Sequence, residues 1–494
     1  MTSREQHTLQ ALLSAISPLS LTNADAAPKG GFGMLTADSR AVVPGAVFVA
    51  TRGTRVDGHS FIAKAIDSGA AAVVCEQLPE YLSPSVVWIQ VADAALALGL
   101  LASQWYNNPS RKLMLIGVTG TNGKTTIATL IYELAQLTGH KAGLLSTVVN
   151  KIGQRDVPST HTTPDPLSLN ALLAEMVDEG CEYVAMEVSS HAAAQHRIAG
   201  LDFDGAIFTN LTRDHLDYHG TFAEYLKAKQ SFFDGLKPEA FALVNSDDRN
   251  GSIMIQNSKA RKFTYSIRAN ADFRGMVVED RIDGMLMKFN TTEVETLFAG
   301  RFNASNLSAV FGASQLMGFD RETALTAISR MTPVAGRFQP FTSADRVTAI
   351  VDYAHTPDAL INVLDTIIDI TNRRVGIITV CGAGGDRDRG KRPIMAAEAA
   401  RRSDRVILTA DNPRSENAED IIVEMRAGVS EADAAKVLAI TDRREAIRTA
   451  IALAQPGDIV LVAGKGHETY QIVGDTKLPF DDCEEVKIAL SQRN

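Results

Sequence analysis

A glycine-rich stretch at residues 117–126 reads Gly-Val-Thr-Gly-Thr-Asn-Gly-Lys-Thr-Thr. The apolar run before it, 113–116, predicts a β-strand, and the pattern after it, 127–137, predicts a helix. A strand, a glycine-rich turn and a helix start together form a cradle for phosphate, because backbone N–H groups and the helix dipole converge on the anion. The order of these elements therefore predicts an α/β domain that binds a phosphorylated ligand.

The side chains of the loop fit a nucleoside triphosphate. Lys124 can reach the terminal phosphates, and the Thr125 hydroxyl can ligate magnesium. The strict phosphate-loop pattern has its first glycine where this chain has Val118, and the chain carries the additional Gly120 inside the loop. We interpret the stretch as a subtype of phosphate loop rather than an ordinary glycine-rich turn.

Length and composition limit the class of protein. A chain of 494 residues predicts two to four domains, and its net charge of −9 without a long basic run argues against a nucleic-acid partner. The cysteines form no Cys-x-x-Cys pair, and the longest apolar stretch, 94–102, is too short to span a bilayer. We expect a cytoplasmic, monomeric protein that is not inserted into a membrane.

The order of apolar and polar segments predicts three domains. Residues 1–108 have the pattern of a small mixed α/β unit, and a linker is expected near 107–110. Residues 109–336 repeat an apolar strand followed by a polar loop, which is typical of a mainly parallel sheet covered by helices on both faces. Residues 337–494 repeat the same pattern and predict a Rossmann-like, doubly wound domain.

Polar clusters follow the predicted strands of the second and third domains. Ligands of parallel sheets bind beyond the carboxyl ends of the strands, so these clusters should meet in crevices there. The clusters are 187–191, 210–215, 245–248, 352–357, 381–387, 411–414 and 464–468.

These clusters, in this order, resemble the Mur ligase family, ATP-dependent enzymes that build the peptide stem of the bacterial cell wall. The resemblance covers nearly the whole chain, and 38–40, 187–191, 213–219 and 352–358 look like the subgroup that adds the third amino acid of the stem. Two positions depart from that subgroup: His161 replaces the usual Asn, and Ala192-Ala193 replaces the usual Gly-Leu.

The resemblance implies an ADP-forming ligation of a carboxylate to an amine through an acyl phosphate. The implied substrates are ATP, UDP-N-acetylmuramoyl-L-alanyl-D-glutamate and meso-diaminopimelate, with Mg²⁺ as cofactor. The alternatives are the same ligation with L-lysine or another diamino acid, and a ligase like folylpolyglutamate synthetase. A phosphate-loop switch or motor protein would not need the additional clusters of the third domain.

The resemblance also assigns roles at the phosphoryl end. It implies catalytic roles for Lys124, Glu187, His215 and Lys229. Thr125 and Glu187 would hold one magnesium and His215 a second, whereas Lys229 matches a lysine that the family carbamoylates and that then binds metal. A glutamate at a strand end beside a phosphate loop suits a hard cation.

Further residues match the family's substrate contacts. The predicted ATP-binding residues are Gly120, Thr121, Asn122, Gly123, Lys124, Thr125, Thr126, Asn303, Asn306, Arg337, Asp352 and His355. The predicted UDP-substrate residues are Ser39, Thr162, Thr163, Ser189, Gln195 and Arg197. The predicted amino-acid-binding residues are Arg387, Asp411, Asn412, Pro413, Arg414, Gly464 and Glu468. A guanidinium can clamp the second carboxylate of diaminopimelate, which lysine lacks.

Overall fold

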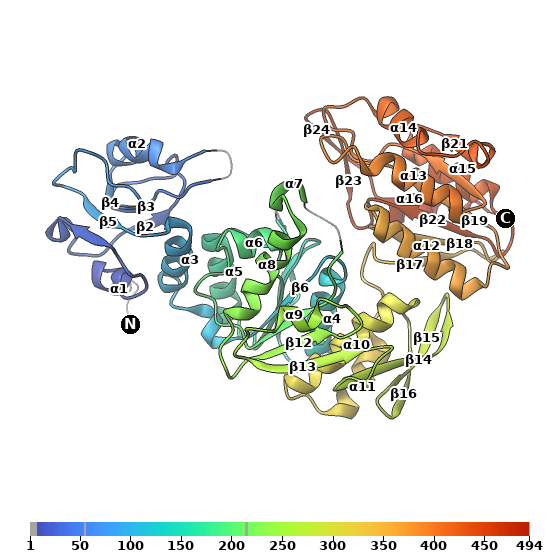
Figure 1. The fold of residues 1–494 in the computed structure, drawn as a ribbon, viewed down its shortest axis with the longest axis horizontal. Coiled ribbons are helices and arrows are strands. Elements are labelled where there is room, and N and C mark those ends of the chain that lie inside the picture. Colours follow the sequence, from blue (N-terminus) through green and yellow to red (C-terminus); the bar gives the residue numbers. More distant parts are fainter. Residues whose placement is uncertain (1–6, 54–55, 160, 213–215, 494) are drawn as a thin grey trace.

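The computed structural model describes residues 7–53, 56–159, 161–212 and 216–493. Within these residues the strands form three main sheets and one separate hairpin. Figure 1 shows the corresponding bodies following one another in chain order, from the blue N-terminal part to the red C-terminal part. In the described part of the chain, no helix is both long enough and apolar enough to cross a membrane.

The N-terminal domain is built on a sheet with the strand order β1-β5-β4-β3-β2, in which only the β1–β5 pair is antiparallel. Helices α1 and α3 cover one face and α2 covers the other. α3 begins after Asp93, whose side chain caps it, and packs against α5 of the next domain. The elements are α1 Leu9–Leu13, β1 Ser20–Thr22, β2 Met34–Thr36, β3 Ala46–Val49, α2 Ile62–Asp67, β4 Ala70–Cys75, β5 Val87–Gln90 and α3 Ala94–Trp105.

The central domain contains the longest sheet, with the order β16-β15-β14-β13-β12-β11-β6-β10-β7-β8-β9. The strands from β7 to β14 in this order pair in parallel. Helices α4, α10 and α11 cover one face of the sheet, and α5 and α8 cover the other.

The strands of the central domain are β6 Met114–Thr119, β7 Ala142–Leu145, β8 Asn150–Ile152, β9 Arg155–Val157, β10 Tyr183–Glu187, β11 Gly205–Phe208, β12 Phe241–Asn245, β13 Arg261–Ser266, β14 Phe273–Arg281, β15 Gly284–Phe289 and β16 Thr292–Thr296. Its helices are α4 Lys124–Leu137, α5 Pro166–Asp178, α6 Ser190–Ala194, α7 Leu216–His219, α8 Phe222–Asp234, α9 Gly251–Met254, α10 Arg301–Leu316 and α11 Arg321–Arg330.

The C-terminal domain has the strand order β17-β18-β22-β19-β20-β21, and every pair except β17–β18 is parallel. Helices α12, α13 and α14 pack on one face and α15 and α16 on the other. The elements are β17 Gln339–Thr342, β18 Thr348–Asp352, α12 Pro357–Thr371, β19 Ile377–Cys381, α13 Lys391–Arg402, β20 Arg405–Leu408, α14 Ala418–Arg426, β21 Val437–Ala439, α15 Arg443–Leu453, β22 Ile459–Ala463, β23 Tyr470–Val473, β24 Thr476–Pro479 and α16 Asp482–Ser491.

The predicted fold class is confirmed: the chain is α/β, with three domains and mostly parallel sheets. The sequence pattern missed the antiparallel segment β14–β15–β16, which extends one edge of the central sheet. Nearly all residues of its first strand are exposed or half-buried, unlike the continuous apolar strands on which the prediction of parallel pairing was based.

Candidate active site

The glycine-rich stretch folds as predicted, into a loop between β6 and α4. Gly120 has a φ of 147°, and a Cβ atom on it would lie 1.8 Å from the Thr209 Oγ1 atom. Thr209 follows β11, the strand that pairs with β6. A side chain at position 120 is therefore excluded by both the backbone conformation and the neighbouring strand.

The segment after β11 also supports the loop through hydrogen bonds. The Thr209 hydroxyl donates to the Asn122 carbonyl oxygen at 2.6 Å, and the Asn122 N–H donates to the Asn210 Oδ1 atom at 2.9 Å. The Thr121 N–H donates to the Asn210 carbonyl oxygen at 2.8 Å. These contacts hold the loop in one conformation against a rigid sheet edge.

Two lysines converge on the phosphate loop. The Lys124 ammonium donates to the Gly120 carbonyl oxygen at 3.0 Å, and the Lys229 ammonium donates to the same oxygen at 2.8 Å. Lys229 lies on α8, is only 2% exposed, and has its Nζ atom 4.9 Å from the centre of the Tyr225 ring. Although its sequence pattern is that of a surface helix, Lys229 is thus buried beside the loop.

A cavity of about 370 Å³ lies above the phosphate loop and extends to the C-terminal domain. Glu187, at the end of β10, is 1% exposed, and its Oε1 atom accepts the Thr147 N–H at 2.7 Å. Thr125, in the first turn of α4, lines the same cavity together with Glu187 and Lys229.

These residues fit a magnesium ion that retains water and phosphate ligands. One carboxylate and one hydroxyl beside a phosphate cradle are the usual protein contribution for Mg²⁺, which binds few side chains. The described residues contain no cluster of three or more His, Cys, Asp or Glu, so a cage made wholly of such side chains is absent from that part. His215, the other predicted ligand, lies outside the described residues.

The predicted adenine-side residues lie on α10, behind the loop. Asn306 lines the cavity, and its amide donates to the Asn303 Oδ1 atom at 3.3 Å. The Asn303 amide donates to the carbonyl oxygen of Ala299, just before α10, at 2.9 Å. Asn306 therefore faces the cavity, whereas Asn303 supports it from within the helix.

Residues of the C-terminal domain complete the cavity. The Arg337 guanidinium donates to the Thr125 hydroxyl at 3.2 Å and lies 4.6 Å from the centre of the Tyr353 ring. Asp352 ends β18, and its Oδ2 atom accepts the Phe338 N–H at 2.7 Å. Burial raises the pKa of Asp352 to about 6, an effect that the positive charge of Arg337 opposes.

The remaining predicted ATP contacts also surround this cavity. His355 lines it, and the His355 ring nitrogen Nδ1 lies 2.8 Å from the Tyr353 carbonyl oxygen. The predicted loop residues that line it are Thr121, Asn122, Gly123, Lys124, Thr125 and Thr126. The structure thus brings together predicted ATP-binding residues that are more than two hundred positions apart in the sequence.

Most of the predicted UDP-substrate residues gather near the end of β10. The Thr163 hydroxyl donates to the Glu187 carbonyl oxygen at 2.8 Å, and the Arg197 guanidinium donates to the Thr163 carbonyl oxygen at 2.9 Å and to Gln195. Burial lowers the pKa of Arg197.

Thr162 and Ser189 line the cavity itself, next to Glu187. The Thr162 hydroxyl accepts a hydrogen bond from the Thr147 hydroxyl at 3.0 Å. Ser39 lies apart from this group, buried in the turn after β2 of the N-terminal domain. The predicted UDP-substrate residues are therefore distributed over two domains.

The predicted amino-acid residues form a second cluster, at the strand ends of the C-terminal sheet. The Asn412 amide donates to the Glu468 Oε2 atom at 2.8 Å. The buried Lys465 ammonium donates to Glu468 and to Asn412, both at 3.1 Å, and its Nζ atom lies 3.6 Å from an Asp411 oxygen. Gly464 adjoins this group, since a Cβ atom on it would lie 2.9 Å from Asp411.

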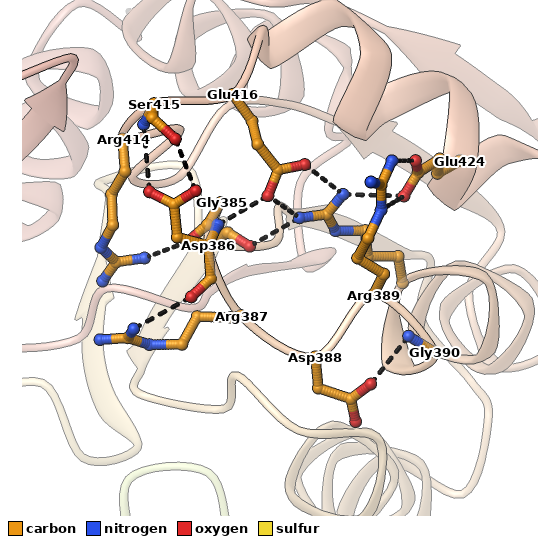
Figure 2. A network of polar contacts seen from close by, with 12 residues as sticks. Gly385, Asp386, Arg387, Asp388, Arg389, Gly390, Arg414, Ser415, Glu416 and Glu424 are labelled. Atoms are coloured by element: carbon orange, nitrogen blue, oxygen red, sulfur yellow. Dashed lines mark hydrogen bonds and ion pairs between the residues drawn. The ribbon is translucent and has the colours of Figure 1, made fainter. Parts of the chain in front are cut away.

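Arg387 and Arg414 lie beside each other (Figure 2), and a Cβ atom on Gly384 would lie 2.9 Å from an Arg414 nitrogen and 3.7 Å from the Arg387 Cγ atom. The Arg414 guanidinium donates to the Gly385 carbonyl oxygen at 2.7 Å, and the Arg387 guanidinium donates to the Asp386 carbonyl oxygen at 3.1 Å. Pro413 precedes Arg414 and packs closely on Gly385, where an added Cβ atom would lie 1.8 Å from the Pro413 carbonyl oxygen.

Some residues of these sites were not predicted from the sequence. Thr209 and Asn210 support the phosphate loop, Tyr353 faces Arg337, and Lys465 lies within the amino-acid cluster. Asn210, Tyr353 and Lys465 belong to the polar clusters at strand ends and Thr209 directly precedes one of them, so position at a strand end was the available signal. Their side-chain types alone did not distinguish them from surface residues.

Comparison with known proteins agrees with this geometry. Models described as "Mur ligase family, catalytic domain", "Mur ligase middle domain" and "Mur ligase, glutamate ligase domain" match residues 32–106, 118–314 and 336–466. A Bacteroides fragilis protein named UDP-N-acetylmuramoyl-L-alanyl-D-glutamate--2,6-diaminopimelate ligase is 55% identical over 480 residues, which are 97% of this chain and 98% of that protein. This chain belongs to the Mur ligase family.

Solved structures resemble this Mur ligase over most of its length. One, titled as a UDP-N-acetylmuramoyl-L-alanyl-D-glutamate--2,6-diaminopimelate ligase, has a TM-score of 0.68 and 35% identity, and the match covers 94% of this chain and 96% of that one. A Mycobacterium tuberculosis folylpolyglutamate synthase, complexed with ADP and AMPPCP, has a TM-score of 0.59 and 16% identity, and the match covers 74% and 91%. The second likeness shows a shared fold alone.

Proposed function

We propose that this Mur ligase uses ATP to join meso-diaminopimelate to UDP-N-acetylmuramoyl-L-alanyl-D-glutamate, as a step in making peptidoglycan precursors. The observation that carries the proposal is the cavity in which the phosphate loop, Glu187 and Lys229 face Arg337 and Asp352 of the next domain. Relatives that bear this substrate pair in their names support the choice of substrates. The reaction belongs in the cytoplasm, where ATP is available, and we expect a monomer.

The chemistry explains why a triphosphate site is needed. A carboxylate is a poor electrophile, because an amine cannot displace oxide from it. In the proposed reaction the D-glutamate carboxylate oxygen attacks the γ-phosphorus and ADP leaves, which gives an acyl phosphate. The amine nitrogen then attacks the acyl carbon, the acyl–oxygen bond breaks, phosphate leaves and the nitrogen loses a proton. Both steps depend on positioning and on neutralising charge at the phosphoryl group.

The cavity supplies that neutralisation. Lys124 contacts the β- and γ-phosphates in this proposal, since its ammonium already lies over the loop. Thr125 and Glu187 hold magnesium, which when bound stabilises negative charge on the phosphate oxygens. Lys229, as a carbamate, would carry a negative charge and act as a further metal ligand, as would His215.

Two groups of opposite charge support diaminopimelate over lysine. Arg387 and Arg414 form a positive group suited to the second carboxylate. Asp411 and Glu468 outnumber the one ammonium of Lys465, so that cluster retains a negative charge for the distal ammonium of the substrate. A lysine substrate would leave the two guanidiniums without a carboxylate.

Phosphate release tests the proposal. Purified protein is mixed with Mg²⁺, ATP, the nucleotide-sugar dipeptide and one diamino acid, and the product is identified by mass. We expect release only with all components present, and a far higher kcat/KM for meso-diaminopimelate than for L-lysine. Hydrolysis without the other substrates would favour a switch or motor protein, and equal rates with lysine would refute the assignment of the amino acid.

A further inference from the structure

Two loops of the C-terminal domain are fastened to each other by one small polar group. The first loop, 382–390, follows β19, and the second, 409–417, follows β20. The Asp386 N–H donates to the Glu416 Oε1 atom at 2.6 Å. In return, the Ser415 hydroxyl and N–H donate to the two carboxylate oxygens of Asp386 at 2.6 and 3.2 Å (Figure 2). Asp386, Ser415 and Glu416 are called the loop clamp below.

The loop clamp is anchored on a buried cation. Arg392, on α13, has a fully buried side chain, and its two terminal nitrogens donate to the two oxygens of Glu416 at 2.7 and 2.9 Å. These bonds, with the Asp386 N–H, hold the pKa of Glu416 at about 2, so its carboxylate is charged at neutral pH. Arg392 also donates to Glu424 of α14 at 2.7 Å. Glu416 therefore connects both loops to the helix layer behind them.

The loop clamp holds the two arginines of the predicted amino-acid site. Asp386 and Arg414 both have a φ of 53°, a conformation that is uncommon for residues other than glycine. Arg387 directly follows Asp386 in the first loop. Arg414 directly precedes Ser415, the residue of the second loop that donates to Asp386. The conformation of the two loops thus sets where the backbones of Arg387 and Arg414 lie relative to each other, and both guanidiniums lie on one side of the clamp (Figure 2).

We propose that Glu416 is a positioning residue that fixes Arg387 against Arg414 and thereby sets the preference for an amino acid with a second carboxylate. The inference rests on the proposed function. Glu416 itself is not a substrate ligand, because both of its carboxylate oxygens already accept hydrogen bonds from Arg392 and the Asp386 N–H. Its effect on the substrate passes through the two arginines.

The test is Glu416→Gln, assayed with meso-diaminopimelate and with L-lysine. The glutamine retains one oxygen for the Asp386 N–H but presents an amide donor to Arg392, so a charged hydrogen bond is lost and the loops separate. We expect kcat/KM for meso-diaminopimelate to fall about tenfold or more. The value for L-lysine should stay within about twofold, because lysine has no second carboxylate to be gripped. KM for ATP should be unchanged.

Glu424→Gln is the matched control. It removes the other carboxylate partner of Arg392 and the side-chain partner of Arg389 in the first loop, but leaves every hydrogen bond among Asp386, Ser415 and Glu416 in place. We expect it to lower the melting temperature without changing the ratio of diaminopimelate to lysine activity. If Glu416→Gln does not fold, Ser415→Ala replaces it, since this variant deletes one hydrogen bond of the loop clamp. It should lower the same ratio by about threefold.

The outcomes separate this inference from the proposed function. If the wild-type enzyme does not ligate meso-diaminopimelate, the proposed function fails before any variant is compared. If the wild-type enzyme does so, but Glu416→Gln or Ser415→Ala lowers both amino-acid activities equally, the clamp only stabilises the domain and the inference is overturned. A selective loss with meso-diaminopimelate, absent from Glu424→Gln, supports it.

Discussion

Replacement of Gly120 by alanine tests whether the glycine-rich loop binds the triphosphate in the conformation seen here. The new Cβ atom would lie 1.8 Å from the Thr209 Oγ1 atom and 3.0 Å from the Thr209 Cβ atom. The Thr209 hydroxyl cannot turn away without losing its 2.6 Å hydrogen bond to the Asn122 carbonyl oxygen. The loop must therefore leave its present conformation.

The cost has two parts. A residue other than glycine at a φ of 147° costs about 1–3 kcal/mol. The lost hydrogen bond adds about 1 kcal/mol. In the free protein the loop relaxes to avoid this strain, so nucleotide binding has to restore the strained form. A total of about 3 kcal/mol corresponds to an affinity for Mg·ATP about a hundredfold weaker.

Isothermal titration calorimetry with Mg·ATP measures this effect, and circular dichroism checks that the variant is folded. The double variant Gly120→Ala/Thr209→Ala removes the clash with the hydroxyl but not the backbone strain. We expect it to bind about as weakly as Gly120→Ala and not weaker still, because Thr209→Ala deletes the same hydrogen bond to Asn122 that the clash already breaks, so the two changes are coupled. If Gly120→Ala binds Mg·ATP within about threefold of wild type, the close approach of the two strands does not shape the nucleotide site.

Three further variants or treatments follow from the same cavity. Chelation of Mg²⁺ by EDTA should abolish phosphate release, and added Mg²⁺ should restore it, since Thr125 and Glu187 are assigned to the ion. Lys229→Ala should be nearly inactive and partly rescued by short carboxylic acids that replace the carbamate; absence of rescue in a folded variant contradicts that role. Burial raises the pKa of Asp352 from 3.8 to about 6, so the folded state binds this proton more tightly than the unfolded chain. The stability from Asp352 is present below about pH 4 and is lost as pH rises through about 6. Asp352→Asn should remove that loss, which is about 3 kcal/mol, and thermal unfolding of both proteins from about pH 4 to 8 shows whether their stabilities diverge over this window.

The phosphate loop and its partners could be predicted because parallel strands end at one edge of a sheet. β6 lies between β10 and β11, so the residues after these strands meet beside the loop. Glu187 ends β10 and was predicted in this way, whereas Thr209, which follows β11, was not. The geometry of parallel sheets therefore predicted that polar clusters distant in sequence form one site.

Burial of charged residues could not be predicted in this way. Lys229, Arg392 and Lys465 are each 2% exposed or less, although lysine and arginine are usually surface residues. Each is buried because partners distant in sequence surround it: Lys229 contacts the phosphate loop, and Arg392 contacts Glu416. Sequence patterns report the period of an element, not which residues of other elements lie opposite it.

The boundary between the central and C-terminal domains is itself part of the ATP cavity. Gly336 has a φ of 66°, and a Cβ atom on it would lie 2.1 Å from the His467 backbone nitrogen. Arg337 follows directly and reaches the Thr125 hydroxyl of the phosphate loop. Arg337 lies at the boundary and contacts Thr125 in the first turn of α4, the helix that follows the phosphate loop. A shift between the domains must therefore move this positive charge relative to the bound phosphates. Assembly of the phosphoryl site and the relative placement of the two domains are therefore one structural event.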